Sequence, residues 1–112
     1  MQLLVLILNK EEYLDEILEA FMEIGITGAT VIDSMGMGRV LAYEIPIFAG
    51  LRRMIHGSRA YNKTVFAVIR DEAKLHKAIS MVEEICGDLS LPGKGLLFII
   101  DLDRVEGLAP ES

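Results

Sequence analysis

The sequence predicts an α+β domain with the ferredoxin-like order strand, helix, strand, strand, helix, strand. Two observations carry this prediction. Short apolar runs alternate with longer stretches whose apolar residues recur at helical spacing, and the order strand, helix, strand occurs on both sides of a long central segment. Because such crossovers are right-handed, both helices are expected on one face of a single sheet. We expect residues 1–112 to form this one domain.

The first half of the chain begins with an apolar strand, LLVLIL at residues 3–8, followed by an amphipathic helix. Asn9, with Glu12 three residues later, predicts the start of this helix. Gly25 predicts its end, since glycine readily adopts the left-handed conformation that closes a helix. Residues 28–35, of mixed polarity, predict the second strand. The predicted inner stripe of the helix is Leu14, Ile17, Leu18, Phe21 and Ile24.

The second half repeats the pattern with TVFAVIR, residues 64–70, as the third strand. Asp71 predicts the N-cap of the second helix, and Gly87 predicts its end. LLFIIDL, residues 96–102, predicts the fourth strand, and residues 105–112 a short tail. The predicted inner stripe of this helix is Leu75, Ala78, Ile79, Val82 and Ile85, with the single cysteine, Cys86, expected to be buried beside it.

Strands one, three and four are apolar on both sides, although helices are expected on one face of the sheet only. Leaving a large aliphatic side chain in water forgoes about 1.5–3 kcal/mol. Several such side chains together would form an apolar patch too large for a monomer. We therefore expect further copies of the chain to bury the second face in a closed homo-oligomer.

The charge distribution restricts the partners. A formal net charge of -6 argues against a nucleic-acid partner, which requires a basic face. Residues 39–63 nevertheless carry +4, which leaves -10 for the rest of the chain. The first strand is too short to span a membrane and leads directly into an acidic helix. We therefore expect a cytoplasmic protein.

The segment GITGATVIDSMGMGRV, residues 25–40, holds the main candidate site. Alternating glycines allow successive N–H groups to point into one concavity, a nest that suits an anion, and the Arg39 guanidinium can bind a phosphate bidentately. From spacing alone, a structural turn is the alternative interpretation. The candidate residues are Gly28, Thr30, Gly36, Met37, Gly38 and Arg39.

GITGATV followed by GMGR resembles the signature of the nitrogen-regulatory PII signal-transduction proteins, whose usual pattern is G-[IV]-T-G-M-T-V and then G-F-G-R-Q. The resemblance implies a homotrimer that binds ATP or ADP in clefts between subunits. It places residues 36–39 at the nucleotide-contacting base of the central loop, with Gly28 and Thr30 on the neighbouring strand. Val40 replaces the glutamine that helps this family bind metal-ATP and 2-oxoglutarate, so sensing of 2-oxoglutarate is not implied.

The second half of the family's site lies before and after the last strand. Here LPGKG retains Gly93, Lys94 and Gly95, and Arg104 follows the strand. Fewer cations are present than is usual in the family, which implies weaker triphosphate binding or a different anion. For both Lys94 and Arg104, an ordinary solvated surface cation is the alternative.

Residues 40–63 correspond to the loop through which PII proteins touch partner enzymes and transporters. From Ile47 onward the spacing suits a short amphipathic helix with a basic side, and we expect Phe48, Leu51, Arg52 and Arg53 to contact an unidentified partner. Packing of this helix on its own oligomer, or docking on an anionic membrane, are the alternatives. We expect membrane contact only through a partner.

Catalysis has little support in the sequence, because a nucleophile needs a neighbouring base and only His56 and His76 are available. We therefore expect a regulatory protein rather than an enzyme. Two other functions remain open. One is an interaction trimer without a ligand. The other is a metal-binding trimer like the ferredoxin-like copper-tolerance CutA proteins, in which His56 would meet His76 or Cys86.

Overall fold

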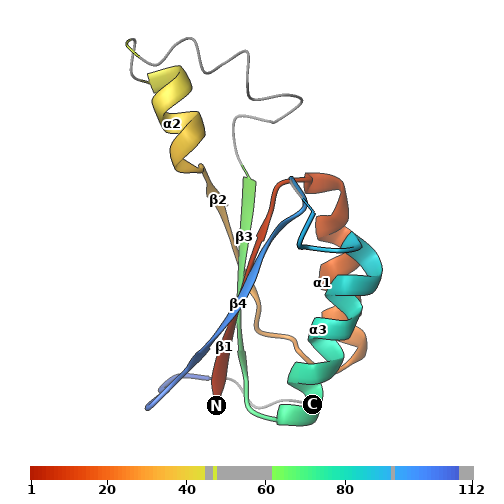
Figure 1. Ribbon diagram of the computed structural model, residues 1–112. Helices are drawn as coiled ribbons and strands as arrows, with labels where there is room; N and C mark the ends of the chain where they lie inside the picture. Colours follow the sequence, from red (N-terminus) through yellow and green to blue (C-terminus); the bar gives the residue numbers. More distant parts are fainter. Residues whose placement is uncertain (45–46, 48–61, 92, 109–112) are drawn as a thin grey trace.

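A computed structural model describes residues 1–44, 47, 62–91 and 93–108 (Figure 1). The elements are β1 (Gln2–Leu8), the 3-10 helix η1 (Glu11–Tyr13), α1 (Leu14–Glu23), β2 (Thr30–Ser34), α2 (Met37–Glu44), β3 (Asn62–Ile69), α3 (Glu72–Cys86) and β4 (Gly95–Asp101). The predicted order strand, helix, strand, strand, helix, strand is confirmed, and two helices that were not predicted, η1 and α2, are added to it.

The strands form a four-stranded sheet in the order β2-β3-β1-β4, and each neighbouring pair is antiparallel. This order, with helices in both crossovers, confirms the predicted ferredoxin-like α+β fold. The apolar strand β1 lies inside the sheet, where Leu4 is opposite Ala67 on β3 and Ile99 on β4. The mixed-polarity strand β2 lies at one edge and β4 at the other.

The two long helices, α1 and α3, cover one face of the sheet (Figure 1). Alternate residues of β1 point toward them, and Leu4, Leu6 and Leu8 have no exposed surface. Cys86 is buried as predicted, and burial raises the pKa of its thiol. The helices contribute Ile17, Phe21, Leu75, Ala78 and Val82 to this core, all of them buried.

Three of the four predicted helix ends are confirmed. Gly25, at φ 89°, closes α1: its N–H donates to the Met22 carbonyl, and the Ile26 N–H donates to the Phe21 carbonyl at 2.8 Å. This pair of bonds is a Schellman motif. The Asp71 carboxylate caps α3 by accepting a bond of 2.8 Å from the Ala73 N–H, and Gly87, at φ 81°, ends it.

The predicted start of the first helix is wrong. The residue that precedes the helical turns is Lys10, not Asn9, and its side chain makes no capping bond. The Tyr13 N–H donates to the Lys10 carbonyl at 3.3 Å, which closes a 3-10 turn. Because this turn takes up residues 11–13, α1 begins only at Leu14.

The central segment is shorter than the predicted 40–63. Residues 40–44 belong to the helix α2. Strand β3 begins at Asn62, because its first residues still pair with β2, where Ser34 lies opposite Asn62. Strand β2 is in turn shorter than the predicted 28–35. The predicted partner-binding residues Phe48, Leu51, Arg52 and Arg53 lie outside the described residues.

The other face of the sheet carries apolar side chains from every strand. Val5 faces this side, and it is only 4% exposed because Phe66 and Phe98 lie directly opposite on the neighbouring strands. Among the described residues, no helix lies over this face (Figure 1). We call it the open face. Its exposed large apolar side chains are Leu96 at 54%, Ile32 at 46%, Ile100 at 44% and Phe98 at 39%.

None of the helices in the described part of the chain is both long enough and apolar enough to span a membrane.

Candidate functional site

The glycine segment forms the junction between β2 and α2. Strand β2 ends at Ser34, and α2 begins at Met37. The N–H groups of Arg39 and Val40 both donate to the Gly36 carbonyl, each at 3.1 Å, so Gly36–Arg39 form the first turn of a helix. Neither Gly36 nor Gly38 has a positive φ. The predicted nest of alternating glycines is therefore wrong, because helix geometry turns these N–H groups along the helix axis instead of into a concavity.

Space beside this turn is nevertheless open. A Cβ added to Gly28, Gly36 or Gly38 would meet no atom of the described residues within 4 Å. Met37, at the start of α2, is 78% exposed. A ligand or a second copy of the chain can thus approach the backbone closely at this turn.

Polar side chains fix the end of the hairpin from which α2 starts. The Ser34 hydroxyl donates to the Asn62 amide oxygen and lies 2.6 Å from the Thr64 hydroxyl. Lys63 donates to Asp33 across the hairpin, and its ammonium is 3.7 Å from Glu11 of η1. The hydrogen bond to Asp33 raises the pKa of Lys63. Sequence reasoning missed this cluster, although polar residues gather there in both strands.

The second predicted part of the site, Gly93–Gly95, leads into β4 at the opposite edge of the sheet. Gly93 has φ 78°, and Gly95 has φ 140°. The Lys94 ammonium lies 3.9 Å from the position that a Cβ on Gly87 would occupy, so it sits beside the C-terminus of α3. A cation is favourable there, because the last carbonyls of a helix carry partial negative charge.

The connection from α3 to the segment 93–95 begins with a turn at Asp88 and Ser90. The Asp88 carboxylate accepts hydrogen bonds from the Ser90 N–H at 2.9 Å and the Ser90 hydroxyl at 2.6 Å. The hydroxyl bond is the main cause, and the N–H bond the second, of a lowered pKa for Asp88.

We expect Ser90→Ala to raise the Asp88 pKa toward its ordinary value of 3.8, because the hydroxyl donor is lost. Since the folded pKa is lowered, the stabilisation from ionised Asp88 is present above 3.8 and is lost as the pH falls through the folded pKa. Carboxyl NMR titration of both proteins measures the shift, with Asp103 as the internal control. An unchanged Asp88 titration in Ser90→Ala would contradict the assignment.

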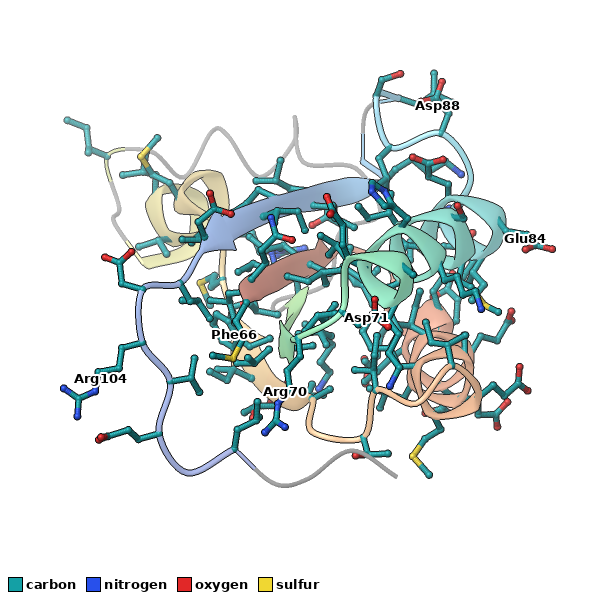
Figure 2. All side chains as sticks on the ribbon, turned by 90° about the horizontal axis from the view of Figure 1, so that it is seen from below. Phe66, Arg70, Asp71, Glu84, Asp88 and Arg104 are labelled. Atoms are coloured by element: carbon teal, nitrogen blue, oxygen red, sulfur yellow. The ribbon has the colours of Figure 1, made fainter. Side chains whose placement is uncertain are left out.

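Arg104 lies beyond the other end of the sheet. It follows β4, and its side chain is 80% exposed, pointing away from the protein (Figure 2). The guanidinium is paired with the carboxylate of Glu106, which is also exposed. An incoming anion must therefore compete with Glu106 for this guanidinium.

A single chain does not bring the predicted residues together. Leu8 on β1 pairs with Gly95 on β4 and with Lys63 on β3, and Lys63 pairs with Asp33 on β2. The turn at residues 36–39 and the segment at 93–95 thus lie near the same end of the sheet but at its two edge strands, which are roughly 14 Å apart across three strand spacings. Arg104 follows the other end of β4, and Gly28 precedes the corresponding end of β2.

The described residues contain no group of three or more His, Cys, Asp or Glu side chains that could hold a metal ion. His76 lies on the exposed side of α3, 3.9 Å from Glu72. Its predicted partner His56 is outside the described residues, and Cys86 is in the core.

Together these features define a ferredoxin-like α+β fold with an open sheet face and a glycine-containing helical turn after β2. The chain belongs to the nitrogen regulatory protein P-II family: the family model described as "Nitrogen regulatory protein P-II" matches residues 1–112, the whole chain. A comparison with curated proteins gives no match. Membership of the family supports a PII-like regulatory role.

Proposed function

We propose that the protein is a homotrimeric regulator that binds a small anion, ATP, ADP or another adenine nucleotide, in the clefts between its subunits. Through residues 40–63 it then controls an enzyme or transporter. A bound nucleotide changes partner binding only if it makes different contacts with the conformation that binds the partner and with the one that does not. The helical turn at residues 36–39 is suited to this coupling because it joins the sheet directly to the segment that follows.

The separation of the predicted site residues on the two edges of the sheet carries this proposal. Each edge of one chain holds half of the residues that the family resemblance assigns to the nucleotide. In a closed ring of copies packed through their open faces, the β2 edge of one copy lies next to the β4 edge of its neighbour. The two halves then line a common cleft.

The charges of these two halves suit an anion. Arg39 from α2 and Lys94 from the segment before β4 are both partly buried, and Arg104 adds a third cation after β4. Guanidinium groups bind phosphate bidentately and strongly. The chain as a whole carries a net charge of -6, so an anionic ligand requires a local group of cations such as this one.

Calorimetric titration with ATP, ADP, AMP and cyclic nucleotides tests the proposal. We expect saturable binding of at least one of them, and we expect Arg39→Ala to weaken it by about tenfold or more, the effect of losing a hydrogen bond to a charged group. Lys77→Ala, which removes an exposed cation from α3, is the matched control and should bind normally. Absence of both heat and a thermal shift with every nucleotide would refute nucleotide binding and favour the interaction trimer without a ligand.

A further inference from the structure

The segment after β4 crosses the end of the sheet and is bound at both of its ends. We call residues 102–108 the C-terminal strap. At its start the Leu102 N–H donates to the Met1 carbonyl at 3.1 Å. At its end the Leu108 carbonyl accepts a hydrogen bond of 3.3 Å from Nη2 of Arg70, the residue that follows β3. The strap therefore connects the end of β4 to the end of β3, the two strands that flank β1. It runs along the side of the sheet that faces away from α1 and α3 (Figure 2).

Apolar contacts add to these two bonds. Val105 and Leu108 are partly buried, and together with Met1, Arg70 and Gly107 they line a depression below the sheet. Gly107 has φ 85°, a conformation that strains any other residue, and this bend precedes the residue that Arg70 binds. The strap therefore follows one defined path, and Arg70 is its attachment to β3.

We infer that Arg70 is a positioning residue that fastens the C-terminal strap and thereby sets where Arg104 is presented. Arg104 lies between the two attachment points, two residues after Leu102 and four before Leu108. With the far attachment lost, the chain after Leu102 samples many conformations, and a ligand must order it again on binding. The part of the inference that concerns Arg104 as a nucleotide contact rests on the proposed function.

The rate of trypsin cleavage after Arg104 measures how often the strap detaches, and the experiment needs no ligand. Arg104 is the only lysine or arginine between residues 95 and 112, so a cut there releases a fragment of defined mass. Cleavage requires the strap to open, and its rate follows the open population. We expect Arg70→Met to accelerate this cut roughly three- to tenfold, the effect of one lost hydrogen bond. Arg70→Lys should restore part of the protection, and Lys77→Met should cut at the wild-type rate.

A chain that ends at Gly107 separates the strap from other effects of Arg70, because it lacks the Leu108 carbonyl. In that shortened chain we expect Arg70→Met to cause no further acceleration, whereas a chain ending at Leu108 should still respond. Equal cleavage of Arg70→Met and wild type in the full chain would overturn the inference. So would an equal acceleration in the chain that ends at Gly107.

Titration with ADP tests the consequence for Arg104. We expect Arg70→Met to weaken ADP binding about threefold to tenfold in the full chain and to have no further effect in the chain ending at Gly107. If Arg70→Met weakens binding equally in both chains, Arg70 contacts the nucleotide itself and is not a positioning residue. If the wild-type protein binds no nucleotide, the proposed function fails, and the cleavage rates alone still decide whether Arg70 fastens the strap.

Discussion

Replacing Phe98 with aspartate is expected to convert the proposed homotrimer into a folded single chain. Phe98 lies in the open face, 39% exposed, opposite Val5 of β1. If further copies cover this face, each subunit of the variant buries a carboxylate without a partner, which costs about 3–5 kcal/mol. The cost is repeated in every subunit, so assembly should be lost at micromolar concentration. Light scattering coupled to size-exclusion chromatography measures the mass.

Met22→Asp is the matched control for this experiment. Met22 is 63% exposed, but it lies on α1, on the side of the protein away from the open face. The same chemical change there should leave the oligomer intact. Circular dichroism should show both variants folded, since neither residue belongs to the core between sheet and helices. A wild-type protein that is a single chain, or a Phe98→Asp variant that keeps the wild-type mass, would refute the proposed interface.

Gly95→Ala is expected to lower the stability of the protein more than Gly93→Ala, the other alanine variant at a glycine of the segment 93–95. A Cβ on Gly95 would lie 2.4 Å from the Ile7 carbonyl oxygen of β1, and the residue has φ 140°. The Ile7 carbonyl and the Gly95 backbone that carries this Cβ both belong to the paired strands β1 and β4, so neither can move without disturbing that pairing. Backbone strain of this kind costs about 1–3 kcal/mol, and the steric clash adds to it. Urea unfolding should show a lower midpoint.

Gly93→Ala separates the two contributions to this effect. Gly93 also has a positive φ, 78°, but an added Cβ there meets no atom within 4 Å in the described part of the chain. Its substitution should cost only the left-handed conformation, about 1–2 kcal/mol. The difference between the two variants then measures the clash with Ile7 together with the greater backbone strain at φ 140°. Equal midpoints for the two would show that the clash is relieved by local movement.

The fold follows from local features of the sequence that the structure confirms. Short apolar runs predict strands β1, β3 and β4, and the helical stripe through Ile17 and Phe21 faces the core as predicted. Gly25, Asp71 and Gly87 mark helix ends because each makes a bond or adopts a conformation that depends on its own residue type. The prediction that Asn9 starts the first helix was wrong, because the Lys10 carbonyl closes a 3-10 turn there. Such a turn is formed by backbone groups, so the side chains in the sequence do not indicate it.

The candidate site was less predictable. A glycine pair such as Gly36 and Gly38 is compatible with either a nest or the first turn of a helix, because glycine permits both. The residues that hold this turn in place come from two strands, with Ser34 bound to Asn62 and Lys63 between Asp33 and Glu11. Their pairing depends on the register of the hairpin, which a single sequence does not specify outside its apolar pattern.

The sequence by itself determined the four strands, the two long helices, their order and the apolar character of both faces of the sheet, because these depend on the periodicity of side chains along the chain. The short helices η1 and α2 were not predicted. Only the tertiary structure decided that residues 36–39 and 93–95 lie on opposite edges, that Arg104 follows the other end of β4, and that Arg70 binds the strap. These relations join residues that are far apart in the chain. Strand order and register bring them together or keep them apart, and neither is a property of a local segment.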